Sequence, residues 1–193
     1  FVDFDPKPVG AASIGQVHKA VLRDGKLVVV KVQRPDIRDE IMNDMEVFDE
    51  IADFLEAHTE FGKRYRLVTT IDEFRKAVIR ELDYRNEQQS LKLIASNLEE
   101  FNRNLVTEPV DDYTTSKVIT MDYVKGTKVT AISPLRKLEM DGKPLAEALF
   151  SAYMKQIVID GFYHCDPHPG NIFITDDNRI ALLDLGMVGY VSS

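Results

Sequence analysis

The segment that most constrains this chain runs from residue 164 to residue 171, with the sequence HCDPHPGN, and LLDLG follows at residues 182–186. Asp166 stands five residues before Asn171, and Asp184 stands thirteen residues after it. Phosphoryl transfer needs oxygen-bearing side chains that hold Mg²⁺ and an acid near the attacking hydroxyl. The spacing therefore predicts a site that handles ATP and magnesium. The alternative is that the three residues only cap loop turns.

Composition limits the class of protein. The chain has 193 residues, 44% of them hydrophobic, which suffices for one core or two small lobes. A net charge of −8 argues against a nucleic-acid partner. The single cysteine, Cys165, excludes an internal disulfide and fits a reducing, intracellular compartment. No apolar run approaches the roughly 20 residues that span a bilayer. Because the chain opens on Phe1, we expect a piece of a longer protein.

Hydrophobic periodicity and turn residues predict an α+β fold. The expected elements are a hairpin (16–22 and 27–33), long helices (36–58 and 72–98), strands (105–110 and 117–121), a helix (145–160) and a second hairpin (172–175 and 179–183). Lys125-Gly126 and Ser133-Pro134 mark a loop-rich crossing. We therefore expect an N-lobe over residues 1–124, with an antiparallel sheet and long helices. Residues 125–193 would begin a helical C-lobe.

A loop of small residues precedes the first expected strand. Its residues are Gly10, Ala11, Ala12, Ser13, Ile14, Gly15, Gln16 and Val17. Small side chains let backbone N–H groups approach phosphate oxygens. Alanines disfavour the left-handed backbone region, so this loop would be a stiff lid over a nucleotide. The alternative is a plain turn between strands.

Lys31 lies within the apolar run VVVKV at residues 28–32. It either extends to a sheet edge or reaches inward to the phosphates of a nucleotide. A buried lysine needs a carboxylate nearby, and the run ELDYRNE at residues 81–87 offers Glu81, Asp83 and Glu87. On one continuous helix, Asp83 and Glu87 would share a face, with Glu81 about 120° from Glu87. The alternative is that this charged run is a solvated face.

A zinc site is the rival interpretation of His164, Cys165 and His168. The chain has four histidines and one cysteine, and no second ligand cluster is visible, which disfavours metal ligation by these groups. We expect Cys165 to be a small buried residue and not a nucleophile.

These motifs together resemble the UbiB/ADCK family of atypical, protein-kinase-like proteins. The segments that carry the resemblance are AASIGQVH (11–18), VKVQRP (30–35), ELDY (81–84), HCDPHPGN (164–171) and DLG (184–186). They follow the family's order over nearly the whole chain. The resemblance implies a bilobal kinase fold that binds ATP or ADP with Mg²⁺.

The resemblance also implies residue roles. Lys31 would contact phosphates, Asn171 and Asp184 would hold Mg²⁺, and Asp166 would occupy the catalytic-acid position. Glu87 is the first choice as the partner of Lys31, with Glu81 as the alternative.

Two further segments take implied roles. Asp122, Tyr123 and Val124 match the hinge, where backbone groups would meet adenine, and the loop at 10–17 would cover the phosphates. Glu81 and Asp83 match an E-x-D motif that engages an N-terminal extension carrying K-x-G-Q, which these 193 residues do not include.

Members of this family support ubiquinone or related prenyl-lipid biosynthesis at mitochondrial, plastid or bacterial membranes. The implied partners are a nucleotide and, further, a prenyl lipid or lipid-biosynthesis proteins, with membrane association through parts outside these residues. Two rival functions stay open. One is a small-molecule phosphotransferase of the aminoglycoside or choline kinase type. The other is a non-catalytic, nucleotide-sensing scaffold.

Overall fold

The computed structural model describes residues 1–11 and 14–191. The strands are β1 (Asp3–Phe4), β2 (Gly10–Ala11), β3 (Gly15–Val21), β4 (Leu27–Gln33), β5 (Asn104–Val106), β6 (Val118–Asp122), β7 (Gly126–Lys128), β8 (Phe162–His164), β9 (Ile172–Thr175), β10 (Ile180–Leu182) and β11 (Val188–Tyr190). The α-helices are α1 (Ile37–His58), α2 (Glu60–Tyr65), α3 (Leu67–Glu81), α4 (Tyr84–Asn97), α5 (Pro134–Glu139) and α6 (Gly142–Lys155).

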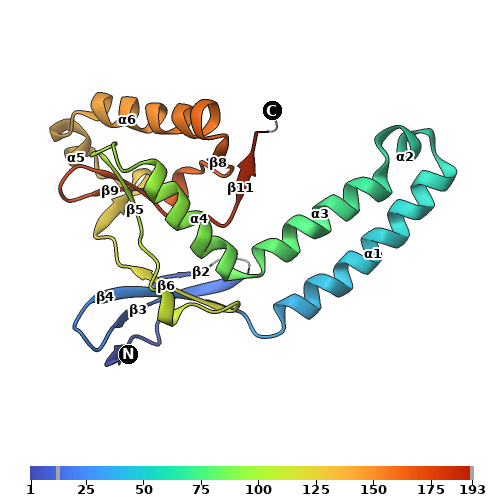
Figure 1. Ribbon diagram of the computed structural model, residues 1–193, viewed down its shortest axis with the longest axis horizontal. Helices are drawn as coiled ribbons and strands as arrows, with labels where there is room; N and C mark the ends of the chain where they lie inside the picture. Colours follow the sequence, from blue (N-terminus) through green and yellow to red (C-terminus); the bar gives the residue numbers. More distant parts are fainter. Residues whose placement is uncertain (12–13, 192–193) are drawn as a thin grey trace.

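The first sheet is antiparallel and follows the order β1-β3-β4-β6, with β2 paired to β3 (Figure 1). The expected hairpin forms because Gly25, at φ 85°, supplies the left-handed turn residue between β3 and β4. Val28 and Val30 on β4 pack with Ala20 and Leu22 in a small cluster of their own. Lys31 therefore points to the opposite face, where α4 lies.

The second sheet has the order β5-β10-β9-β7. Strand β5 belongs to the segment that was expected in the N-lobe, yet it pairs in parallel with β10 of the second hairpin. Strand β6, next along the chain, returns to pair with β4 of the first sheet. The segment from β5 to β6 thus joins the two sheets, and the division between residues 124 and 125 stays a prediction.

Helix α4 lies at the centre of the core. Tyr84, Leu91, Ile94 and Leu98 recur at helical spacing, and all are buried. They pack with residues of β6, α6 and the second hairpin in one large cluster. The position of α4 fixes Glu87, in its first turn, against β4.

The expected single helix over residues 72–98 is wrong. The chain forms α3 and α4 with a break at Leu82 and Asp83, and α3 begins earlier, at Leu67. Asp83 has an extended backbone and accepts a hydrogen bond from the Arg85 N–H, so it caps the start of α4. The break separates a helix without buried residues, α3, from one that lies in the core.

Helices α1 and α3 pack side by side and extend from the body as an arm, with the short helix α2 at its far end (Figure 1). Sequence periodicity predicted α1 but did not reveal α2. Helix α6 continues into a π-helical turn at Gln156–Asp160, and Gly161 at φ 62° ends it, as the sequence predicted. Over residues 1–11 and 14–191, no helix combines the length and apolar character that a membrane span requires.

Candidate functional site

Three segments far apart in the sequence meet at the ammonium group of Lys31. The Nζ atom donates hydrogen bonds to the two carboxylate oxygens of Glu87 at 3.0 and 3.2 Å. It also donates to Oδ1 of Asp184 at 3.1 Å. The side chains of Lys31 and Glu87 are 8% and 3% exposed, so both charges are withdrawn from water. We call Lys31, Glu87 and Asp184 the lysine cluster.

The cluster contains more carboxylates than cations. Burial lowers the pKa of Lys31, but the carboxylates of Glu87 and Asp184 outweigh it, and the net effect raises this pKa. Burial raises the pKa of Glu87 to about 7, with Lys31 lowering it and Asp184 adding to the rise. Burial and then Asp184 also raise the pKa of Glu81. The lysine keeps its proton, while the surplus negative charge favours a further proton or a cation.

Glu81 and Glu87 converge on the DLG loop, which the helical-wheel argument did not anticipate. A Cβ atom placed on Gly186 would lie 3.9 Å from Oε2 of Glu87 and 4.0 Å from Cγ of Glu81. The predicted separation of 120° assumed one continuous helix. The break at Leu82 and Asp83 places Glu81 and Glu87 on two separate helices, so that angle does not apply. The carboxylate that contacts Lys31 is that of Glu87.

The segment with Asp166 and Asn171 is closed by a short strand pair. Strand β11, after the DLG motif, pairs antiparallel with β8, before Asp166. The Leu183 N–H donates to the carbonyl of Asn171 at 2.9 Å, which ties the second hairpin to this loop. The Asn171 amide donates to Oδ2 of Asp166 at 3.1 Å. Asp184 has a φ of 61°, a left-handed conformation that Asp adopts more readily than most residues.

His164 has a structural environment. Its side chain is buried, Nδ1 lies 2.9 Å from the Tyr153 hydroxyl, and its backbone N–H donates to Gln156. Burial lowers the pKa of His164, so the ring stays neutral at physiological pH. His168 accepts a hydrogen bond from the Gly170 N–H through Nδ1. Cys165 is exposed, so the expectation of a buried residue is wrong.

The loop at 10–17 lies at the edge of the first sheet. Gly10 and Ala11 form β2, which pairs with Gln16 and Val17, while Ala12 and Ser13 lie outside the described residues. Ile14 packs on the edge of the large core. Gly15 is required by space, because a Cβ atom there would lie 2.6 Å from the Val32 carbonyl oxygen and 2.7 Å from the Tyr84 hydroxyl.

Tyr84 is a site residue to which the sequence argument gave no role. Its side chain is buried, and the ammonium of Lys31 lies 5.2 Å from the centre of its ring, within cation–π range. Its hydroxyl lies beside Gly15, so this one side chain borders both Lys31 and the loop. The sequence feature that could have identified Tyr84 as a site residue was its position within ELDY, one residue after Asp83, the residue that caps α4.

The expected hinge, residues 122–124, follows β6. The N–H groups of Asp122 and Tyr123 donate to the carbonyls of Glu108 and Leu27, at 3.0 and 3.3 Å. Adenine would therefore have to use other backbone groups of this segment. Asp122 also forms an ion pair with Lys26 at 2.6 Å.

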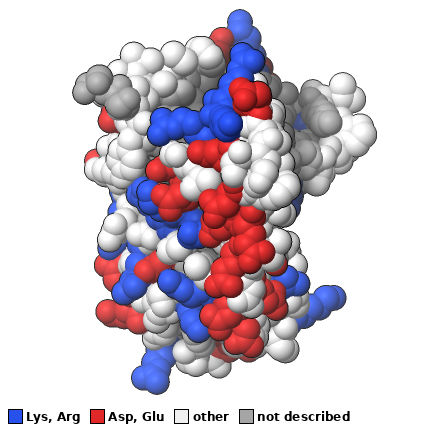
Figure 2. Space-filling view, turned by 90° about the vertical axis from the view of Figure 1, so that its right-hand side faces the viewer, with Lys and Arg blue, Asp and Glu red and all other residues white. Residues whose placement is uncertain are grey.

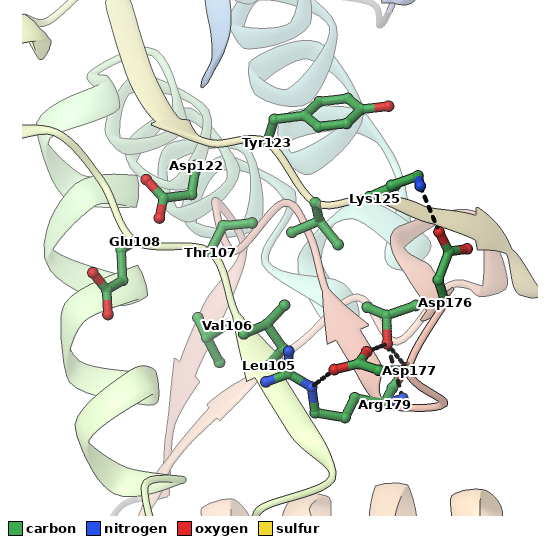
Figure 3. A pocket seen from close by; sticks show the side chains of 12 residues that line it. Leu105, Val106, Thr107, Glu108, Asp122, Tyr123, Lys125, Asp176, Asp177 and Arg179 are labelled. Carbon is green, nitrogen blue, oxygen red and sulfur yellow. Dashed lines mark hydrogen bonds and ion pairs between the residues drawn. The ribbon is translucent and has the colours of Figure 1, made fainter. Parts of the chain in front are cut away.

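A cavity of about 360 Å³ lies beside the hinge (Figure 3). Its walls are β5, the segment from Asp122 to Lys125, and the turn of the second hairpin. Ion pairs of Lys125 with Asp176 and of Arg179 with Asp177 line one side (Figure 3). No residue of the lysine cluster lines this cavity, so it is separate from the phosphate end of the expected nucleotide site.

Comparison with known proteins places these residues in a family. The profile of the ABC1 atypical kinase-like domain matches residues 1–193. This chain belongs to that family. The chain is 38% identical, over its full length, to Protein ACTIVITY OF BC1 COMPLEX KINASE 8, chloroplastic, of Arabidopsis thaliana, and covers 26% of that protein. It is 37% identical over 98% of its length to the Probable protein kinase UbiB of Aliivibrio fischeri (strain MJ11), and covers 36% of that relative.

Solved structures give the same fold. The chain matches Rv3197 of Mycobacterium tuberculosis, solved as an erythromycin complex, with a TM-score of 0.78 and 28% identity, over 98% of this chain and 47% of the other. It matches the Rio2 kinase of Chaetomium thermophilum with a TM-score of 0.53 and 12% identity, over 98% of this chain and 49% of the other, which shows a shared fold. The α+β, protein-kinase-like fold and the UbiB resemblance predicted from sequence are therefore confirmed. The ABC1 domain described here spans from about a quarter to about half the length of its curated relatives.

The electrostatics of the lysine cluster predict a pH-dependent stability. The ordinary pKa of a glutamate is 4.5 and that of Glu87 is about 7, so folding disfavours the charged form of this side chain. Its contribution to the free energy of unfolding is then full below pH 4.5 and falls as pH rises toward 7. We expect the parent protein to lose stability relative to Glu87→Gln over this interval. Urea unfolding of both proteins between about pH 5 and about pH 8 measures the difference.

Glu147→Gln, an exposed change on α6, is the matched control. The difference in stability between the parent and this variant should not change with pH over the same interval. A stability difference between parent and Glu87→Gln that stays constant with pH would contradict the assignment.

Proposed function

We propose that this ABC1 domain binds ATP or ADP with Mg²⁺ and acts as an atypical kinase or ATPase. The observation that carries the proposal is the lysine cluster, in which Lys31, Glu87 and Asp184 meet from three separate segments. A kinase-like fold implies nucleotide binding, and in such folds a strand lysine paired with a helix glutamate contacts phosphates. The group that such a site transfers is a phosphoryl group.

The donor atoms near the cluster fit a magnesium–nucleotide complex. Asn171 uses its amide nitrogen on Asp166, which leaves its carbonyl oxygen as an acceptor, and Asp184 offers a side chain that is 45% exposed. Among residues 1–11 and 14–191, no three His, Cys, Asp or Glu side chains are grouped to hold a metal by themselves. Mg²⁺ commonly takes one or two protein oxygens and completes its shell with phosphate and water. Asn171 and Asp184 would hold it, and it would neutralise charge on the phosphate oxygens.

Each residue of the candidate site has a distinct role in this proposal. Lys31, held by Glu87, would exchange its contact with Asp184 for a phosphate oxygen. Asp166, oriented by the amide of Asn171, would accept the proton of the attacking hydroxyl or water. The loop at 10–17 would cover the phosphates, and the hinge at 122–124 would meet adenine through backbone groups. Tyr84, whose ring centre lies 5.2 Å from the Lys31 ammonium, would help to hold that group in place.

The finer function is a role in ubiquinone or related prenyl-lipid biosynthesis, with a prenyl lipid or proteins of that synthesis as partners. Its support is the family resemblance. The curated relatives named above are chloroplastic and bacterial, which fits a plastid or bacterial site of action and leaves the mitochondrial alternative as a proposal. Two rivals remain as outcomes of the tests below. They are a phosphotransferase for amino-alcohols and a scaffold that binds nucleotide without turnover.

Nucleotide affinity should depend on metal and on Asp184. Phosphates and the surplus carboxylates repel each other, so ADP should bind much more weakly in EDTA than with Mg²⁺. Asp184→Asn should remove most of that metal dependence. Its loss of affinity should be at least the tenfold to hundredfold, roughly, that is typical when only an outer-shell partner of a metal ligand is changed. Calorimetric titration with ADP measures both effects.

The matched control is Asp53→Asn, an exposed acid of α1 that lies outside both the cluster and the cavity beside the hinge. It should bind like the parent. ADP affinity that is indifferent to EDTA would remove the basis of the proposed function.

Turnover should depend on Asp166 more than binding does. Removing a general base typically lowers rates by about 10²- to 10⁴-fold, so Asp166→Asn should release phosphate from ATP far more slowly with nearly unchanged ADP affinity. Phosphate release by the parent, Asp166→Asn and the control Asp53→Asn, with and without prenyl lipid precursors and an amino-alcohol panel, measures this. Intact nucleotide binding with no phosphate release by the parent would favour the scaffold. Transfer to an amino-alcohol would favour the small-molecule phosphotransferase.

A further inference from the structure

The far end of the arm is a hydrogen-bonded turn with an unusual surface. We call residues 59–68, which include α2, the arm tip. Thr59 Oγ1 accepts from the Gly62 N–H at 2.9 Å and donates to the Leu55 carbonyl at 2.6 Å. Gly62 is buried against α1, where a Cβ atom would lie 2.3 Å from the Leu55 carbonyl oxygen. Glu56 accepts from the Val68 N–H at 2.9 Å and so closes the other side of the turn.

This turn displays apolar side chains to solvent. Phe61 is 58% exposed, Tyr65 is 56% exposed and Val68 is 41% exposed. The rings of Phe61 and Tyr65 lie 4.8 Å apart, so they form one continuous surface. Phe54, just below the tip on α1, adds a further exposed ring. A group of neighbouring exposed apolar side chains, rimmed by polar residues, is typical of a surface that contacts a protein or a membrane.

The same turn is basic on an acidic protein. Lys63, Arg64 and Arg66 are exposed within the tip, whose one acid is Glu60. Lys63 lies 4.0 Å from Glu60. Among the residues that the structure describes, Arg64 and Arg66 form no ion pair, and the Arg64 guanidinium lies 5.9 Å from the centre of the Tyr65 ring. The whole chain, by contrast, has a net charge of −8.

The shaft of the arm carries the opposite charge. Helix α1 alone contains eight acidic residues, from Asp39 to Glu56. Figure 2, viewed from the side of the arm, shows a band of Asp and Glu below a group of Lys and Arg. An anionic surface would repel this shaft and attract the tip, so contact would be made end-on.

We propose that the arm tip docks on an anionic phospholipid bilayer. Aromatic rings favour the interface between water and hydrocarbon, and Lys and Arg beside them pair with anionic headgroups. Phe61 and Tyr65 enter the interface, while Lys63, Arg64 and Arg66 contact lipid phosphates. The acidic shaft stays in water and holds the body of the domain away from the surface. An acidic protein partner would account for the cations alone, whereas an anionic bilayer accounts for the cations and the exposed rings together.

The test uses the 193-residue chain and vesicles of phosphatidylcholine, alone or with phosphatidylglycerol. Because the chain has no Trp, Phe61→Trp is a specific reporter of the tip. Its emission should shift to shorter wavelength only with the anionic vesicles, and lipid-borne quenchers should dim it. In co-sedimentation, Lys63→Gln/Arg64→Gln/Arg66→Gln and Phe61→Ala/Tyr65→Ala should each bind about tenfold or more weakly than the parent, and added salt should weaken the parent's binding.

Two controls make comparable changes on the body of the domain. Arg23→Gln/Lys117→Gln/Lys143→Gln removes three exposed cations of the body, and Leu138→Ala removes an apolar side chain that is 86% exposed. Both should bind vesicles like the parent, and thermal unfolding should show all variants folded. The proposal is overturned if the parent binds no anionic vesicles, or if tip and control variants bind alike. Absence of vesicle binding would also point to an acidic protein as the partner of the tip.

Discussion

The buried ammonium of Lys31 is the interaction on which the rest of the site depends. A charged group with 8% exposure is tolerated only where carboxylates compensate for lost water, and here Glu87 and Asp184 do so at about hydrogen-bond length. The three residues come from β4, from α4 and from the loop after β10. One electrostatic requirement therefore holds the first sheet, the central helix and the DLG loop in a common geometry.

That requirement leaves a charge imbalance, which connects structure to function. Glu81, Glu87 and Asp184 carry three potential negative charges near one lysine, and the raised pKa of Glu87 is the consequence. A cation brought in with phosphates would relieve the excess of negative charge. In this view, the cluster is incomplete as a set of protein groups and becomes balanced when nucleotide and metal arrive together. The oxygen of Asn171 and the exposed half of Asp184 are placed to receive them.

Local chemistry in the sequence was sufficient for much of this fold. The two hairpins, α1 and the Gly161 helix end follow from turn residues and apolar spacing, which act over a few residues. The break between α3 and α4 was not predicted. Asp83 is of a residue type that favours helix starts, but the apolar spacing that reaches Leu82 gave no sign that one helix ends there. The break also brings Glu81 to the DLG loop, so helical-wheel geometry failed for the same reason.

The candidate site divides along the same line. Motif spacing identified Lys31, Asp166, Asn171 and Asp184 as candidates, because the chemistry demands particular side chains in a particular order. Motif spacing could not identify the contact of Lys31 with Asp184 or the position of the Tyr84 ring beside the ammonium, since both depend on how distant segments pack. The occupied N–H groups of the hinge and the exposed rings of the arm tip are likewise properties of packing.

Proton release on nucleotide binding tests the central account most directly. Mg²⁺ brought in with ADP should lower the pKa of Glu87 from its value of about 7, so protons should leave the protein near neutral pH. Calorimetric titration in buffers of different ionisation enthalpy counts these protons, and comparing the parent with Glu87→Gln cancels the protons released by ADP itself. The account predicts greater release from the parent than from Glu87→Gln. Equal release from both proteins would contradict it.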